Sequence, residues 1–155
     1  MGLPSLSKSY LFFTVIHVIL FALALAVCGL YGNDLKRAMD SDVDTDSKWI
    51  FAVVVGALSA VTCVIYFIPF ILRVCGIFIA GWDFILFILW IAVFGVFGRM
   101  YIGEDPEGVG AIRLMKNAVW VDLANALLWL ILSIGMALYW WKGDRRSRFT
   151  GRAHV

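Results

Sequence analysis

The stretch from Ile77 to Arg99, IFIAGWDFILFILWIAVFGVFGR, most constrains the fold, because it is apolar apart from Asp83 and the closing arginine. An α-helix rises about 1.5 Å per residue, so this stretch can cross the roughly 30 Å hydrocarbon layer of a bilayer. Placing a carboxylate at that depth costs free energy unless it is paired with another group, protonated or hydrated. We therefore expect Asp83 to face other helices and not lipid.

Further apolar runs supply those helices. With 63% hydrophobic residues and a mean hydropathy of +0.91, the 155-residue chain is too apolar for an average water-soluble domain. The runs predict four spans, at about 10–31, 49–72, 77–98 and 117–141. We predict a single all-α domain over residues 1–155, a four-helix transmembrane bundle followed by a basic tail at 142–155.

The predicted connections are short. Gly32 to Lys48 is polar and is interpreted as a loop, and Pro69 is expected to kink or fray the end of the second span. Only a tight turn fits between the second and third spans, so these two are expected to be antiparallel neighbours. Small residues recur in the first two spans and favour close helix approach. They are Ala22 and Ala26, then Gly56, Ser59, Ala60 and Cys63.

Four spans place both termini on one side of the membrane. Lysine and arginine are nearly balanced between the two sides, but the segment KGDRRSRFTGR concentrates five basic residues after the last span. Since basic segments remain cytoplasmic, we predict that both termini are cytosolic. The same side chains are candidate contacts for anionic lipid, or else only set the topology. They are Lys142, Arg145, Arg146, Arg148 and Arg152.

Polar residues inside the spans are the candidate functional groups. His17 and Asp83 are expected at similar depth, about 10 Å into the first and third spans. If they pair, the pair either relays protons or binds a cation, or it only fixes helix packing. Asp122 and Asn125 share one face of the fourth span, and Arg99 ends the third span at similar depth. An Arg99–Asp122 ion pair is expected there.

The face of the fourth span that includes Asp122 is predicted to point into the bundle. It comprises Asp122, Asn125, Trp129, Ser133 and Met136. Aromatic residues near the span ends are interpreted as belts that anchor the protein at the two membrane surfaces. These include Tyr31, Trp49, Tyr66, Trp82, Tyr101, Trp120, Trp140 and Trp141.

Cysteines and known motifs offer little chemistry. The three cysteines show no paired spacing and are expected to be free thiols, with Cys75 placed for palmitoylation beside the membrane. There is no serine-nucleophile motif, no HExxH and no phosphate-binding glycine loop. We therefore expect no enzyme activity, no cofactor and no metal site. A net charge of only +2 argues against nucleic acid as a partner.

Two segments resemble a known family. WDFILFILWIAVFGVFGRMYIGEDPEG and MKNAVWVDLANALLWLILSIGMALYWW, within four short-looped spans, are similar to the MARVEL-domain (membrane-associating) proteins of filamentous fungi. The similarity extends from Tyr10 to about Phe149, and it lies in the pattern of residue types along the helices. The resemblance implies a non-enzymatic role in membrane organisation, as in lateral domains of the eisosome kind, or in membrane apposition or trafficking. No functional residues transfer, because the family has no catalytic motif.

The expected function is therefore a membrane scaffold that associates with lipids, and with copies of itself or other membrane proteins. The plasma membrane is the expected location, with an internal or vesicle membrane as the alternative. Two other functions stay open. One is a small transporter or channel subunit that uses His17 and Asp83, and the other is an accessory subunit of a larger membrane complex.

Overall fold

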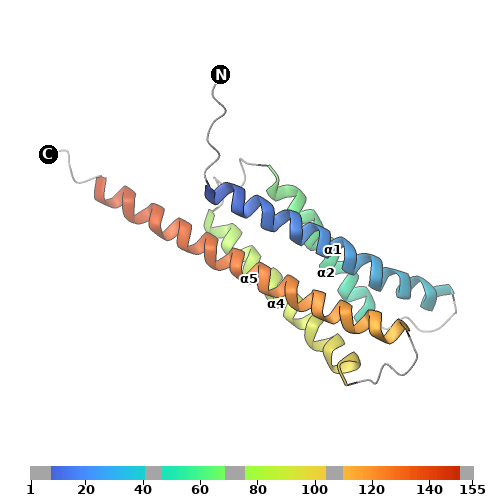
Figure 1. Cartoon of the computed structure of the whole chain (residues 1–155). Coiled ribbons are helices and arrows are strands. Elements are labelled where there is room, and N and C mark those ends of the chain that lie inside the picture. Colours follow the sequence, from blue (N-terminus) through green and yellow to red (C-terminus); the bar gives the residue numbers. More distant parts are fainter. Residues whose placement is uncertain (1–7, 41–46, 69–75, 104–109, 151–155) are drawn as a thin grey trace.

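The structure, a computed structural model, describes residues 8–40, 47–68, 76–103 and 110–150. These residues form four α-helices and no strand: α1 (Lys8–Asp40), α2 (Ser47–Tyr66), α4 (Gly76–Tyr101) and α5 (Gly110–Thr150). The helices lie side by side and alternate in direction, so that the start of α1 and the end of α5 point to the same end of the bundle (Figure 1). The predicted all-α four-helix bundle is confirmed.

The bundle consists of two closely packed pairs. α1 packs along α2, and α4 packs along α5, while the pairs meet less extensively through α1 with α5 and α2 with α4. The backbones of α1 and α4 do not approach each other, so these two helices lie on a diagonal of the bundle. This arrangement decides which polar side chains can meet.

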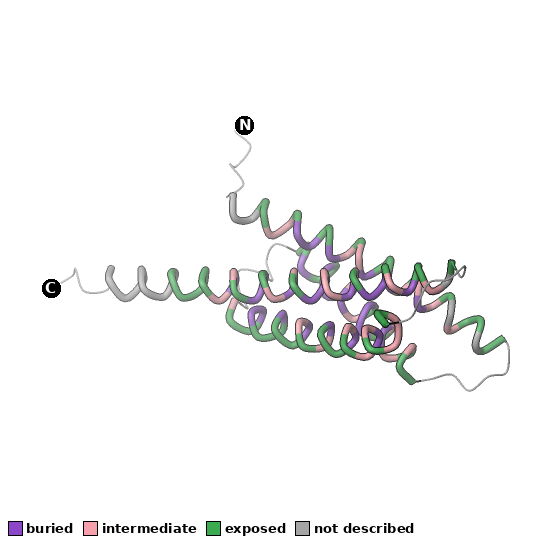
Figure 2. The backbone as a smooth tube through the Cα atoms, turned by 60° about the horizontal axis from the view of Figure 1, so that its bottom comes forward, coloured by how far each residue is buried: buried purple, intermediate pink, exposed green. Residues whose placement is uncertain are grey.

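Each helix buries one row of residues, and the residues beside that row are partly buried or exposed. On α4 the buried row recurs every three or four residues and comprises Ile79, Ala80, Asp83, Leu86, Trp90, Val93 and Phe97. Large apolar side chains remain exposed on all four helices, and buried and exposed residues alternate along each helix (Figure 2). Each helix is long and apolar enough to cross a membrane. The chain is therefore a multi-pass membrane protein whose apolar exterior suits lipid.

The helices extend beyond several predicted boundaries. The segment predicted as a loop from Gly32 is helical as far as Asp40, and α5 runs from Gly110 to Thr150 instead of 117–141. Hydropathy locates the lipid boundary, whereas residues such as those in LKRAM are good helix formers and continue the helix into water. α2 ends at Tyr66, before the predicted end at 72, and Pro69 and Cys75 lie outside the described residues.

α1 and α2 approach each other closely at Gly56. A Cβ atom built there would lie 2.7 Å from Cys28 Sγ and 3.4 Å from the Ala24 carbonyl oxygen. Ala22 and Ala26 are exposed, because positions two residues from Ala24 lie about 200° round the helix. The predicted use of small residues therefore holds for Gly56, but its partners on α1 are Ala24 and Cys28.

Replacing Gly56 by leucine is expected to lower the free energy of unfolding by about 1–3 kcal/mol, because the added side chain must push α1 and α2 apart. The measurement is an unfolding titration of the purified protein with sodium dodecyl sulfate, followed by circular dichroism. Gly95→Leu is the matched control, since a Cβ atom at Gly95 meets nothing within 4 Å. Equal losses for the two variants would contradict the close approach at Gly56.

Candidate functional site

The interior of the bundle holds polar side chains from all four helices. The buried polar residues are His17, Ser59, Thr62, Asp83, Asp122, Asn125 and Ser133. Four of the five predicted intramembrane polar residues are in this set, and only Arg99 is not. Since lipid cannot hydrogen-bond to these groups, their partners inside the protein decide what they can do.

Tyr66 stands between His17 and Asp83. Its hydroxyl donates to Asp83 Oδ1 at 3.1 Å, and its ring lies edge-on to the imidazole of His17, with ring centroids 5.1 Å apart. His17 Nδ1 donates to the carbonyl oxygen of Phe13 at 2.7 Å. Because α1 and α4 lie on a diagonal, Tyr66 of α2 fills the space between the two residues. The direct His17–Asp83 pair, which the sequence left open, is not formed, and Asp83 accepts a hydrogen bond from Tyr66 instead.

Other polar groups join neighbouring helices. Trp90 Nε1 of α4 donates to Ser59 Oγ of α2 at 2.8 Å. Ser133 Oγ of α5 donates to the carbonyl oxygen of Ala80 on α4 at 2.8 Å. Hydrogen bonds of this kind hold transmembrane helices together and fix their register. They give most of the interior polar groups a packing role.

Asp122 pairs with a tyrosine and not with an arginine. The hydroxyl of Tyr31 on α1 donates to Asp122 Oδ2 at 2.6 Å, whereas Arg99 is exposed. Arg99 follows Phe97, which is in the buried row of α4, by two residues and so points about 200° away from the interior. The expected Arg99–Asp122 ion pair is wrong for this reason.

The predicted inward face of α5 is confirmed. Asp122, Asn125 and Trp129 are fully buried, and Ser133 and Met136 are nearly so. Several polar atoms along this face have no hydrogen-bond partner in the described part of the chain. They are Asp122 Oδ1, Asn125 Oδ1 and Trp129 Nε1, together with His17 Nε2 across the interface. The imidazole of His17 and the indole of Trp129 lie with ring centroids 6.2 Å apart.

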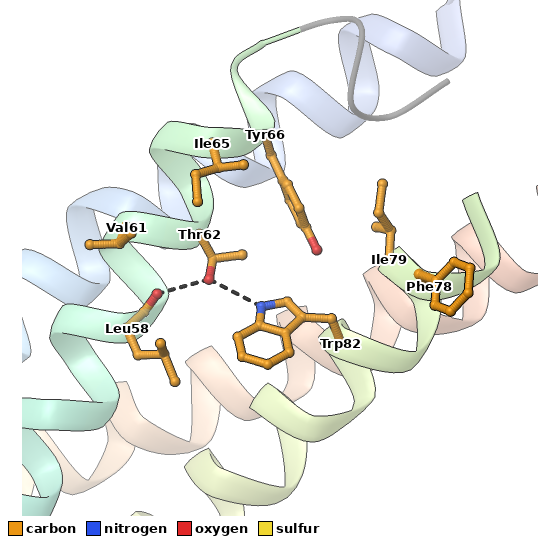
Figure 3. A pocket seen from close by; sticks show the side chains of 8 residues that line it. All are labelled: Leu58, Val61, Thr62, Ile65, Tyr66, Phe78, Ile79 and Trp82. Atoms are coloured by element: carbon orange, nitrogen blue, oxygen red, sulfur yellow. Dashed lines mark hydrogen bonds between the residues drawn. The ribbon is translucent and has the colours of Figure 1, made fainter. Parts of the chain in front are cut away.

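A lateral groove opens between α2 and α4 near the end of the bundle where the chain termini lie. Its volume is about 290 Å³, and eight side chains line it: Leu58, Val61, Thr62, Ile65, Tyr66, Phe78, Ile79 and Trp82. Figure 3 shows the Tyr66 hydroxyl pointing into the space between the two helices, and the Trp82 indole crossing from α4 towards Thr62. Trp82 Nε1 donates to Thr62 Oγ1 at 3.2 Å, and Thr62 Oγ1 donates to the Leu58 carbonyl oxygen at 2.8 Å. The groove is thus apolar, with its polar atoms bonded inside the protein.

The sequence interpretation missed the donors of these contacts. Tyr31 and Tyr66 were expected in interfacial belts, but both are buried and donate to carboxylates. The spacing of apolar residues along each helix could have shown that these tyrosines are buried, because each tyrosine continues a buried row of its helix. On α1 that row is Ile16, Leu20, Ala24, Val27 and Tyr31. Trp49 and Tyr101 likewise pack in an aromatic cluster with Phe97.

Other predicted positions are placed as follows. Cys28 and Cys63 are free, as expected. Lys142 is exposed. Cys75 and Arg152 lie outside the described residues, as do the side chains of Arg145, Arg146 and Arg148 on the last turns of α5. Within the described ranges no three His, Cys, Asp or Glu side chains gather as metal ligands.

The fold and the interior together define a class, a multi-pass α-helical membrane protein whose mainly apolar core contains a few polar side chains and whose side carries a lateral groove. Comparison with protein-family models, with curated proteins and with solved structures gives no match for this chain. The function is therefore argued from the residues themselves.

Proposed function

We propose that this protein is a non-enzymatic membrane organiser that acts by associating with lipids and with other membrane proteins. The observation that most supports the proposal is the lateral groove between α2 and α4. Its apolar lining and its volume of about 290 Å³ suit part of one hydrocarbon chain, and the volume is just below the range of about 300–1,000 Å³ typical of small-molecule pockets. A groove on the outer wall of a transmembrane bundle adjoins lipid chains directly.

The interior polar contacts also support a structural function. Asp83 is bonded to Tyr66, Ser59 to Trp90, and Ser133 to the backbone of α4. Such contacts make a defined bundle, and a defined bundle presents a constant apolar surface to lipid. This is the kind of protein that the resemblance to MARVEL-domain proteins implies.

The proposed orientation places both termini in the cytosol, at the plasma membrane or at an internal or vesicle membrane. It is supported by the basic segment after the last span, where each basic residue near an anionic surface contributes on the order of 1 kcal/mol. In this orientation the groove lies in the cytosolic half of the bilayer. The bound lipid would then come from the leaflet that the basic segment contacts.

The second candidate is a small transporter or channel subunit. It is favoured by the unpartnered polar atoms of His17, Asn125 and Trp129 in the interior, because intramembrane polar groups often mark ion pathways. Transport requires Asp83 to exchange protons or ions. In a membrane organiser Asp83 has only to accept the hydrogen bond from Tyr66. The two functions therefore differ in what Asp83→Asn should do.

The test of lipid binding uses the full chain in vesicles that contain a phosphatidylcholine with a photoreactive acyl chain. We expect labelling of peptides that contain Phe78 or Trp82. In Val61→Trp the indole fills the groove, and labelling should fall at least fivefold. Val64→Trp is the matched control, because Val61 and Val64 on α2 are 56% and 53% exposed but only Val61 lines the groove.

Equal labelling in the two tryptophan variants would contradict a groove-bound lipid. The same vesicles can be assayed for proton and cation flux. A flux that the wild-type protein supports and Asp83→Asn abolishes would overturn the organiser in favour of the transporter.

A further inference from the structure

We infer that Asp122 and Asn125 of α5, together with the Tyr31 hydroxyl of α1, form a buried binding site for a small monovalent metal cation. This site goes beyond the proposed membrane-organising function. It lies at the α1–α5 contact, apart from the lipid groove between α2 and α4.

The first argument is the pair of free oxygen atoms. Asp122 Oδ1 and Asn125 Oδ1 are buried without a hydrogen-bond partner in the described part of the chain, and both side chains are 0% exposed. Residues three apart share a helix face, about 4.5 Å apart along the axis. Leaving two buried acceptors unbonded is unfavourable, because each has lost its hydrogen bonds to water. Two such atoms on one helix face are placed to share a ligand.

The second argument fixes the identity of the asparagine atom. Asn125 Nδ2 donates to the carbonyl oxygen of Val121 at 3.1 Å. A carbonyl can only accept a hydrogen bond, so the amide nitrogen must face Val121 and the amide oxygen must face away from it. The free atom of Asn125 is therefore an oxygen, which can bind a cation or accept a hydrogen bond but cannot donate to Asp122.

The third argument is charge. The Tyr31 hydroxyl donates to Asp122 Oδ2 at 2.6 Å, which leaves Oδ1 as the free oxygen of the carboxyl group. The ionised form of a buried carboxyl group needs a positive partner, and within the described residues Asp122 has a hydrogen bond only to Tyr31. Lys36, Arg37, Arg99 and Arg113 are exposed and Lys116 is half-buried. A single water could donate to both free oxygens, but it would leave the negative charge uncompensated.

The fourth argument is the choice of cation and the rigidity of the site. Carboxylate, amide and phenol oxygens are hard ligands of the kind that alkali and alkaline-earth cations prefer. One carboxylate balances a single positive charge, which favours a monovalent ion.

The Tyr31 ring is stacked on Phe97 at a centroid distance of 4.5 Å and lies edge-on to Trp49 at 5.6 Å. These contacts hold the hydroxyl in place beside Asp122.

The test is the thermal unfolding of the full chain in detergent, in sodium, potassium or choline chloride at one ionic strength. We expect a higher Tm in at least one alkali salt than in choline chloride, by on the order of 5 °C at saturation, because a ligand that binds only the folded state stabilises it. The shift should saturate with salt concentration and disappear in Asp122→Asn. Asp83→Asn is the matched control and should keep the shift.

A second variant covers the case in which Asp122→Asn does not fold. Asn125→Ala retains the carboxylate but removes one oxygen ligand, and it should raise the salt concentration for half-maximal shift about tenfold. Equal Tm values in choline and alkali chlorides for the wild-type protein would overturn the site and leave water as its occupant. A shift unchanged in Asn125→Ala or Asp122→Asn would also overturn it.

Discussion

Trp90→Ala is expected to lower the free energy of unfolding by about 3 kcal/mol, the lower end of the range for a buried aromatic residue. The indole is fully buried on α4, and its nitrogen donates to Ser59 Oγ on α2 at 2.8 Å. Removing it leaves a cavity and takes from Ser59 the donor that links the two helices. We expect a loss of unfolding free energy at the lower end of this range because lipid is as apolar as the protein core. The contact is therefore stabilised by packing and not by transfer of the side chain out of water.

The measurement is a denaturant titration of wild type and variant, with helix content as the signal. Trp120→Ala is the control, because Trp120 is 58% exposed on the outer face of α5 and lipid can replace its contacts. Trp90→Phe should recover most of the packing but not the hydrogen bond. If Trp120→Ala were as destabilising as Trp90→Ala, the contact between α2 and α4 would not be important for stability.

Phe97→Ala is expected to lower the free energy of unfolding by a similar amount, again about 3 kcal/mol. The fully buried Phe97 ring is the centre of the aromatic cluster at the end of the bundle away from the groove. It stacks on Tyr31 with centroids 4.5 Å apart and lies edge-on to Trp49 at 5.1 Å. Aromatic pairs of this kind add about 0.5–1.5 kcal/mol each beyond simple burial. Its removal should also loosen the tyrosine that bonds Asp122.

Two readouts separate these effects. Unfolding titrations report the total loss, and near-ultraviolet circular dichroism reports the order of the aromatic cluster. Phe84→Ala is the matched control, since Phe84 is 47% exposed on the same helix. A near-ultraviolet signal that stays at the wild-type level in Phe97→Ala would contradict the role of Phe97 as the centre of the cluster.

The helix boundaries illustrate one limit of sequence reasoning. Hydropathy correctly indicated four helices, but it ended the first at Tyr31, whereas α1 continues to Asp40. The apolar run ends where lipid ends, and the helix ends where backbone caps and local propensity allow. The end of the apolar run and the end of the helix have different physical causes, so they need not fall at the same residue.

The polar contacts illustrate a second limit. The sequence placed Asp83, Asp122 and Asn125 inside the bundle, because a carboxylate or amide cannot face lipid. It did not identify their partners. Tyr66 and Tyr31 were assigned to the membrane surface, and Arg99 was paired with Asp122, because span order and depth were known but rotation about each helix axis was not.

By itself, therefore, the sequence determined the class of this protein. Long apolar runs require transmembrane helices, and the few polar residues within them require an interior. Only the tertiary structure decided the contacts. It placed α1 diagonally across from α4, Tyr66 between His17 and Asp83, Arg99 on the outer face and an open groove between α2 and α4. Those features depend on how four helices rotate and pack together, and that packing depends on the shapes of many side chains at once.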